Sequence, residues 1–213
     1  MVKCNQCNRQ FKTQAALNQH RQASHQQASV QPRRPAPARR QQPANPVREG
    51  ELVLARSELI ASLEVVAEAS EASAWIPIIP TDTRLTWLNK LAASFDQIIW
   101  LSAALYWKPA VGTTFNGSLI VGIDWNPDAK NAARTTVQAC VPHFDTPVWQ
   151  QARMTLPPQR LQSRRSYVLK AAANVDKSPG VILVHAKTSA SAKLVFLGDL
   201  WMEYKVRLMG PSA

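Results

Sequence analysis

The sequence has few cysteines and no long apolar run. Its 213 residues include three cysteines, too few for a disulfide framework, so we expect synthesis in a reducing compartment and a metal site rather than disulfides. The longest apolar stretches, such as "QIIWLSAALYW", are about half the length that crosses a bilayer, and the N-terminus lacks the apolar segment of a signal peptide. We therefore expect a soluble protein with no membrane partner.

Motifs of catalysis are also missing. "GTTFNGS" has the glycine spacing of a phosphate-binding loop but lacks the Lys-Ser/Thr pair that must follow, and neither G-x-S-x-G nor H-E-x-x-H occurs. His185 is in phase with Val181 and Leu183 on a predicted strand, so we expect a packed residue and not a base. Cys140 is expected to be a small buried apolar residue. We predict that the protein is not an enzyme.

Acidic residues are almost absent from the first fifty positions. Residues 1–50 carry nine Lys or Arg against Glu49 alone, a net charge of +8, whereas residues 51–213 have a net charge of +3. A concentrated basic segment favours a polyanionic partner, most often nucleic acid, bound by phosphate neutralisation. The expected nucleic-acid contacts are Lys3, Arg9, Lys12, Arg21, Arg33, Arg34, Arg39, Arg40 and Arg48.

Four metal ligands stand in residues 1–25, "CNQCNRQFKTQAALNQHRQASH" from position 4. Cys4 and Cys7 form a C-x2-C pair, and His20 and His25 form an H-x4-H pair twelve residues later. Two thiolates and two imidazoles suit the tetrahedral preference of zinc. The segment resembles a C2H2 zinc finger of ββα form, with Phe11 and Leu17 at its two core positions.

The finger is poorly equipped to read a DNA sequence. With His20 as the seventh helical residue, the three base-reading positions are Thr13, Ala16 and Gln19. None of these side chains can form the bidentate hydrogen bonds that arginine makes with guanine. In addition, one finger covers only about three base pairs. We expect a general contact with RNA or with a protein such as a host factor.

Residues 26–50 have the composition of an extended arm. They contain five prolines and two arginine pairs and have no aromatic residue. This composition predicts a disordered segment. It is either a charged spacer or an RNA-binding arm, and arginine without compensating acid favours the arm.

Residues 51–213 show the alternation of β-strands. In "GDLWMEYKVRL" one face is apolar and the other polar; the apolar face holds Leu200, Met202, Tyr204, Val206 and Leu208. Further strands are predicted in "ELVLARSEL", "QIIWLSAALYW", "GSLIVGIDW", "VWQQARMTL", "SYVLKAA" and "GVILVHAKT". A helix is predicted within residues 81–97, with Thr81, Asp82 or Thr83 as N-cap. The pattern indicates a β-sandwich whose core and subunit contacts hold most of the seven tryptophans.

Two stretches resemble a known family. "RLTWLNKLAASFDQIIWLSAALYWKPAVGTTFNGSLIVGIDWNPDA" and "LGDLWMEYKVRLMGP" are similar to the central block and the closing strand of jelly-roll coat proteins from small icosahedral plant RNA viruses, the sobemovirus, tombusvirus and luteovirus–polerovirus groups. "VWQQARMTLP", between them, also fits. The resemblance covers roughly residues 75–211.

The resemblance implies a mainly β fold, a single eight-stranded antiparallel jelly roll with one or two short inserted helices. It also implies a capsid protein whose copies form a closed shell around single-stranded viral RNA, found in the virion and assembled in the host cytoplasm. About 160 residues suffice for that shell domain and leave no room for a second, protruding sandwich. The finger departs from the plain basic arms of these groups.

The same resemblance suggests calcium between subunits. In related shells, aspartates near a turn after a central strand hold the ion. The matching oxygen donors here are Asp124, Asn126, Asp128, Asp145 and Asp199. Turn hydrogen bonds are an equally good interpretation of these side chains.

Two alternatives remain open at this point. One is a regulatory protein in which the finger binds nucleic acid and the β-domain is an interaction module. The other is a carbohydrate-binding sandwich with an appended finger. "RLQSRRSY", with Arg160, Arg164 and Arg165, either lines the interior of a shell or is a solvated loop.

Overall fold

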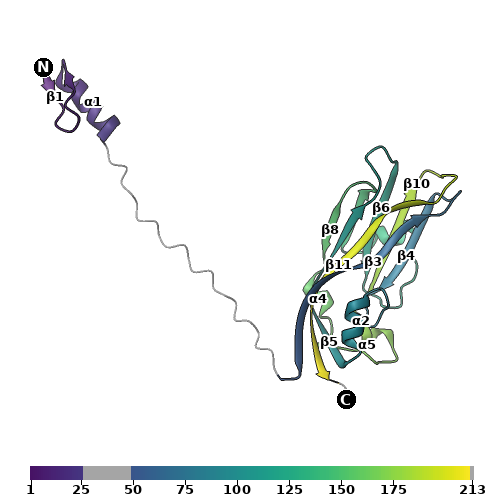
Figure 1. The fold of residues 1–213 in the computed structure, drawn as a ribbon. Coiled ribbons are helices and arrows are strands. Elements are labelled where there is room, and N and C mark those ends of the chain that lie inside the picture. The colour runs from purple at the N-terminus through teal and green to yellow at the C-terminus, as the bar shows by residue number, and fades with distance from the viewer. Residues whose placement is uncertain (26–48, 212–213) are drawn as a thin grey trace. The chain divides into compact units, whose positions relative to one another are not determined.

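The computed structural model describes residues 1–25 and 49–211, apart from the side chain of His25. The chain divides into two compact units, residues 1–46 and 47–213 (Figure 1). The predicted arm at residues 26–50 lies, except for Glu49 and Gly50, outside the described residues.

The N-terminal unit is a short hairpin followed by a helix. Strands β1 (Val2–Lys3) and β2 (Gln10–Phe11) pair antiparallel, and helix α1 (Gln14–His25) follows. The hairpin turn closes through a bond from the Asn8 N–H to the Cys4 carbonyl, and Asn8 adopts φ +59°. Asparagine tolerates this left-handed conformation better than most residues. The unit therefore has the ββα order that the sequence predicts.

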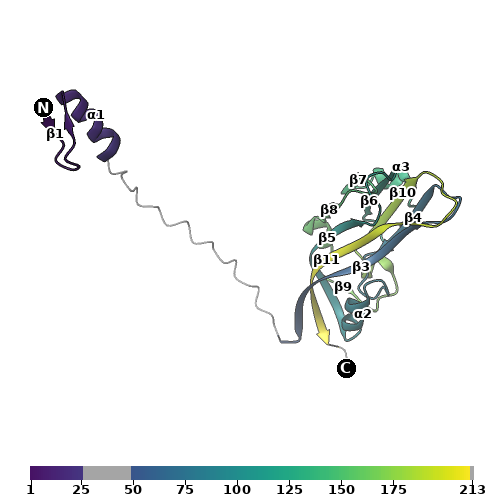
Figure 2. The same cartoon turned by 45° about the horizontal axis from the view of Figure 1, so that its top comes forward.

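The body, residues 49–211, is a sandwich of two antiparallel sheets (Figures 1 and 2). One sheet, called here the β10 sheet, has the order β4 (Glu71–Pro77), β10 (Val181–Thr188), β6 (Gly117–Asp124) and β7 (His143–Pro147). The other, the β11 sheet, has the order β3 (Glu51–Val65), β11 (Val195–Pro211), β5 (Phe95–Pro109) and β8 (Ala152–Thr155). A two-residue strand, β9 (Tyr167–Val168), also pairs with β5.

This strand order is that of a jelly roll. The first long strand, β3, pairs with the last, β11, across more than a hundred residues, and every pairing in both sheets is antiparallel. The mainly β prediction is confirmed. The β10 sheet has four strands and the β11 sheet five, because β9 is added to the eight expected.

The core lies between the two sheets. The apolar face predicted for β11 points into it: Leu200, Met202, Tyr204, Val206 and Leu208 are all buried. The alternation of β6 is less simple, because Ile120 and Gly122, on its other face, are buried as well. Helix α3 (Arg134–Gln138) covers that face, and a second small core forms there from Ile120, Ala132, Val137, Cys140, Val181 and Leu183.

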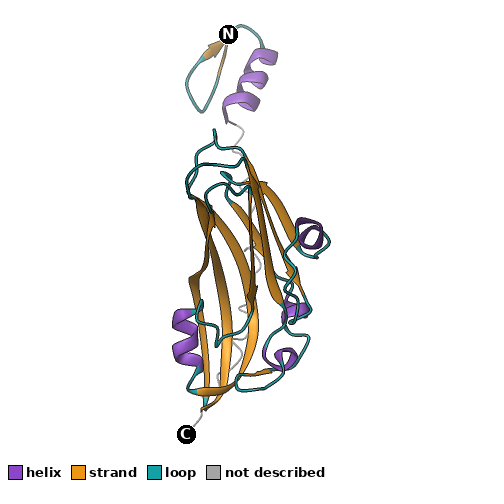
Figure 3. Cartoon of the chain, turned by 90° about the vertical axis from the view of Figure 1, so that its right-hand side faces the viewer, coloured by secondary structure: helices purple, strands orange, loops and turns teal. Residues whose placement is uncertain are grey.

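Four short helices interrupt the strands, against one or two predicted (Figure 3). The predicted helix is α2 (Thr86–Ala92); the others are α3, α4 (Pro158–Leu161) and α5 (Asn174–Lys177). Helices of four or five residues are too short to show a 3.6-residue period, which explains why the sequence does not predict them. Two predicted strands are shorter than expected: "VWQQARMTL" forms only β8 and "SYVLKAA" only β9.

The predicted N-cap of α2 is wrong. Leu85 occupies that position, and no side chain next to it in sequence caps the helix. The cap comes instead from β3: the Glu58 carboxylate accepts the N–H groups of Trp87 (2.7 Å) and Leu88 (3.1 Å). A carboxylate at this helix end satisfies free N–H groups and complements the helix dipole.

No helix among the described residues is both long and apolar enough to span a membrane.

Candidate functional site

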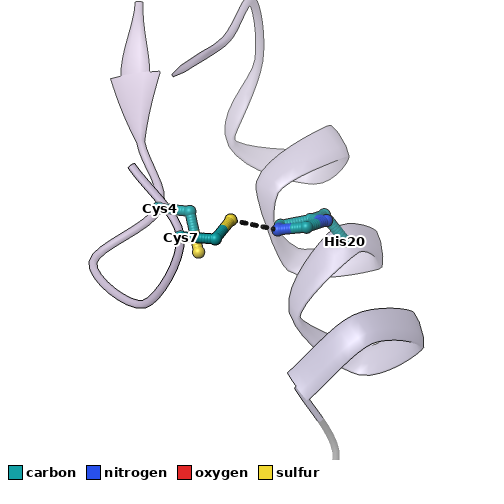
Figure 4. A group of neighbouring side chains, drawn as sticks. All are labelled: Cys4, Cys7 and His20. Atoms are coloured by element: carbon teal, nitrogen blue, oxygen red, sulfur yellow. Dashed lines mark hydrogen bonds between the residues drawn. The ribbon is translucent and has the colours of Figure 1, made fainter. Parts of the chain in front are cut away.

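Three of the four predicted metal ligands converge in the N-terminal unit. The ligand atoms of Cys4, Cys7 and His20 all lie within 4.8 Å of one another, and the Cys7 sulfur is 3.0 Å from His20 Nε2 (Figure 4). The two cysteines come from the hairpin and His20 from the middle of α1. The hairpin turn and the helix thus bring together residues that are 13 to 16 positions apart.

The surroundings of these ligands favour metal binding. The backbone N–H of Gln6 points to the Cys4 sulfur and lowers the pKa of that thiol, as does the N–H of Cys7. The Phe11 ring lies 4.8 Å from that of His20, centroid to centroid, and Leu17 is buried beneath them. Hydrogen bonds to a thiolate favour the deprotonated form that binds a metal, and a small apolar core packs beside the ligands.

The donor set fits zinc. Zinc bonds to sulfur at about 2.3 Å and to nitrogen at about 2.0–2.1 Å, so ligand atoms around one ion lie roughly 3.5–3.8 Å apart. Cys4, Cys7 and His20 meet that requirement with small adjustments. His25 ends α1, five residues after His20, and its side chain lies outside the described residues.

The helix start agrees with the numbering assumed for base reading. Because α1 begins at Gln14, His20 is its seventh residue, and Thr13, Ala16 and Gln19 fall at the three base-reading positions. The Thr13 hydroxyl, however, accepts the Ala16 N–H at 3.3 Å and so acts as a helix cap. Of the three base-reading residues, Ala16 is apolar and Thr13 is engaged as the cap. Only the polar side chain of Gln19 has no polar contact among the described residues.

The predicted phosphate contacts divide into two groups. Those in the N-terminal unit are all exposed: Lys3, Arg9, Lys12 and Arg21. The other five lie outside the described residues: Arg33, Arg34, Arg39, Arg40 and Arg48.

The expected calcium donors after β6 are engaged in local hydrogen bonds. The Asp124 carboxylate accepts the Asn126 N–H, and the Asn126 side-chain oxygen accepts the Asp128 N–H. Asp128 in turn accepts the side-chain amide of Asn174 at 2.7 Å. These contacts shape the turn, and they are those expected of Asx turns.

The remaining two donors lie elsewhere. Asp145, on β7, pairs with Arg134 at 2.8 Å, and Asp199, on β11, accepts the Ser62 hydroxyl at 2.7 Å. Since β7 and β11 belong to different sheets, one chain does not gather these oxygens; among the described side chains, only the Cys4 group comes together as a metal site. A calcium ion at the turn would need oxygens from a neighbouring copy, and its binding stays a prediction.

The arginines of "RLQSRRSY" lie on α4 and the loop that follows it. Arg164 pairs with Asp176 of α5 at 2.7 Å, whereas Arg160 and Arg165 are exposed without an ion pair among the described residues. The segment supplies little concentrated positive charge of its own.

His185 and Cys140 behave as expected of packed residues. His185 is 6% exposed, and neither ring nitrogen has a hydrogen-bond partner within the described part of the chain, so it is not positioned as a base. Cys140 is buried, and burial raises the pKa of its thiol, which makes it unreactive.

Sequence reasoning missed two features of the body. One is the Glu58 cap, which no local pattern signals because 29 residues separate it from Trp87. The other is a pair of aromatic rings, Trp201 and Tyr106, on the outward face of the β11 sheet. The alternation of "GDLWMEYKVRL" places Trp201 on the polar face, and that signal was present in the sequence.

Comparison with known proteins gives one family and many similar folds. A family model described as "Viral coat protein (S domain)" matches residues 23–213. No curated protein matches the chain. Similar solved structures include tobacco necrosis virus (TM-score 0.66, 18% identity), with 76% of this chain and 97% of that chain covered.

Two further structures show the same fold. Cucumber necrosis virus has a TM-score of 0.67 at 19% identity, and the match covers 78% of this chain but 58% of that one. Cocksfoot mottle virus has a TM-score of 0.62 at 12% identity, with 76% of this chain and 96% of that chain covered.

Proposed function

Because the chain belongs to the viral coat protein family, we propose that copies of it assemble into a closed icosahedral shell around single-stranded viral RNA. The family match over residues 23–213 carries this proposal, because it spans the whole sandwich. As a virus capsid protein, the chain has a structural role in the virion and is not an enzyme. Assembly in the host cytoplasm and a plant host, as for the necrosis viruses with the same fold, are parts of the proposal.

The uneven charge of the chain supports an RNA-neutralising role for the N-terminal arm. Residues 1–50 carry a net charge of +8, whereas the sandwich carries +3 in a sequence three times as long. Arginine–phosphate contacts release counterions from the nucleic acid, so RNA binding should weaken steeply as salt rises. The arginine pairs at 33–34 and 39–40 are the densest positive charge in the chain.

The N-terminal unit is proposed to bind one zinc ion through Cys4, Cys7, His20 and His25. The convergence of the first three side chains supports this assignment. Zinc would link the hairpin to α1, and the exposed cations Lys3, Arg9, Lys12 and Arg21 would then face RNA or a host factor from a folded tip. The metal supplies stability here, not chemistry.

Replacing the arm's arginine pairs tests how RNA is packaged. In a variant with glutamine at Arg33, Arg34, Arg39 and Arg40, particles should contain less RNA, measured as a lower ratio of absorbance at 260 and 280 nm. The matched control replaces Arg160, Arg164 and Arg165 of the body by glutamine, removing a similar number of charges. Equal RNA loss in both variants would contradict a special role for the arm.

Zinc binding is tested by metal content. Purified full chain should contain one zinc per copy by atomic emission, and Cys7→Ser should contain much less. A wild-type chain free of zinc after purification in zinc-containing buffer would contradict the assignment.

A further inference from the structure

Two aromatic rings lie side by side on the outward face of the β11 sheet. Trp201 of β11 and Tyr106 of β5 are register partners in neighbouring antiparallel strands. Their neighbours Leu200, Met202 and Leu105 point the opposite way and are buried in the core. Arg153 of β8 is the register partner of Tyr106 on its other side, so the row continues to the edge of the sheet.

Each ring has a cation over it. Lys108 Nζ lies 3.9 Å from the centre of the Trp201 ring, and the Arg153 guanidinium carbon lies 4.9 Å from the centre of the Tyr106 ring. A groove of about 350 Å³ adjoins the row, lined by Tyr106, Trp107, Lys108, Gln151, Ala152 and Arg153. Its volume falls in the range of about 300–1,000 Å³ that is usual for ligand sites.

Trp201 lacks the indole hydrogen bond that two other tryptophans of the body make. Trp107 and Trp125 each donate the indole N–H to a backbone carbonyl, of Val148 and Val141 respectively. The Trp201 N–H is buried and, like that of Trp100, has no acceptor among the described residues. Trp201 is also only partly buried, and its register partner on β3, Leu59, is 40% exposed.

Glu203 interacts with two residues of the row, Tyr106 and Arg153. Its carboxylate accepts the Tyr106 hydroxyl and lies 3.8 Å from Arg153. Lys108, in contrast, forms no ion pair with any described residue, and Arg153 keeps 57% of its side chain exposed. The Lys108 ammonium has no carboxylate partner in the described part of the chain, so it can turn from the Trp201 ring to a phosphate and uncover that ring for a base.

We propose that this row, Trp201, Tyr106, Lys108 and Arg153, is a stacking site for the bases of single-stranded RNA. Aromatic and guanidinium planes stack on any base, and nearby cations meet the phosphates that connect the bases. Sugars also stack on aromatic rings, but a cation over each ring favours an anionic polymer over a neutral glycan. The proposal rests on the proposed function for the identity of the RNA and adds a site on the sandwich to the arm.

The test compares two tryptophans that both lie under a lysine. Trp75, on β4 of the β10 sheet, is 40% exposed, and Lys130 Nζ lies 5.5 Å from the centre of its ring. The zinc-loaded full chain is titrated with a short fluorescent oligouridylate at several salt concentrations. Trp201→Leu should weaken binding about 5- to 100-fold. Trp75→Leu should bind like the wild type.

Salt dependence separates this site from the arm. Stacking releases few counterions, so Trp201→Leu should leave the slope of log affinity against log salt unchanged, whereas the arm variant with four glutamines should reduce it. A normal slope in the arm variant with weak binding by Trp201→Leu would contradict the arm's role and support the stacking site. Wild-type binding by a folded Trp201→Leu chain would overturn the stacking site and leave the arm's role intact.

Photo-crosslinking gives a second readout that needs no variant. Ultraviolet irradiation of the wild-type complex with 4-thiouridine RNA should label peptides that contain Tyr106 or Trp201. Labelling of the Trp75 peptide instead would overturn the proposal. So would a Trp201→Leu chain that binds oligouridylate normally but no longer forms particles, because the row would then be a contact between copies.

Discussion

The Glu58 side chain links three elements of the body. It points from β3 into the sandwich, is 8% exposed, and accepts hydrogen bonds from two backbone N–H groups of α2 and from the Tyr204 hydroxyl. A buried carboxylate is costly unless donors surround it, and here three donors do so. One side chain thus fixes α2, the edge strand β3 and the central strand β11 to one another.

Removing that carboxylate should destabilise the body strongly. We expect Glu58→Ala to lower the free energy of unfolding by about 3–5 kcal/mol, because two helix N–H groups and a buried phenol lose their acceptor. Urea denaturation of the variant measures this loss. Glu64→Ala, an exposed position on the same strand, is the matched control and should change the value by less than about 0.5 kcal/mol. Equal effects of the two substitutions would show that the cap contributes nothing.

Tyr204 makes the body sensitive to alkali. Burial raises the pKa of its hydroxyl above the ordinary value, and the bond to Glu58 raises it further. Above about pH 10 the unfolded chain loses this proton and the folded chain keeps it, so the free energy of unfolding should fall as pH rises. Between pH about 9 and 11, Tyr204→Phe should show a shallower decline in urea midpoint than the wild type. Parallel declines would contradict the assigned shift.

His185 illustrates a buried polar group without a partner. Its register partners are Ser73 and Ile120, and neither ring nitrogen finds a described acceptor or donor. We expect His185→Leu to leave the free energy of unfolding unchanged or to raise it by about 1–2 kcal/mol, since the penalty of an unsatisfied group disappears. A loss of stability in thermal or urea unfolding at neutral pH would indicate that the imidazole has a partner in solution.

At the scale of elements, sequence patterns predict strands better than connections. The alternation of residues 198–208 identifies the buried face of β11 correctly, because one face of that strand is core and the other is not. In β6 the alternation correctly places Leu119, Val121 and Ile123 in the main core, but it does not signal that the second face, with Ile120, is buried as well. The convergence of Cys4, Cys7 and His20 is predictable because their spacing is local. Trp201 and Tyr106, in contrast, become neighbours only through the pairing of distant strands.

A bulge in β11 requires glycine at position 198. The register of β11 against β3 shifts there, Gly198 adopts φ +151°, and a Cβ atom would clash with the Lys108 carbonyl oxygen. Gly198→Ala should cost more than about 2 kcal/mol of stability. Gly112→Ala is the control: a Cβ there meets nothing within 4 Å, and it should change stability by less than about 0.5 kcal/mol in the same denaturation experiment. A tolerated alanine at 198 would mean that the bulge can relax.

At the scale of the whole molecule, the chain combines a coat-protein sandwich with a basic N-terminal segment, residues 1–50, that contains the Cys4, Cys7 and His20 group. The family match covers the whole sandwich, and the charge of residues 1–50 is the basis of the RNA-binding role proposed for the arm. Shell closure relies on many weak contacts between copies, so assembly should depend on protein concentration as well as on salt. A regulatory protein with the same finger would show neither dependence.

Electron microscopy is the direct test of the proposed assembly around RNA. The full chain is expressed, purified at moderate salt, and examined by negative stain together with its absorbance at 260 and 280 nm. We expect closed spherical particles whose absorbance ratio shows bound RNA. A small species that carries no nucleic acid, and that still forms no particles when RNA and calcium are added, would contradict the account and point to a regulatory role for the finger.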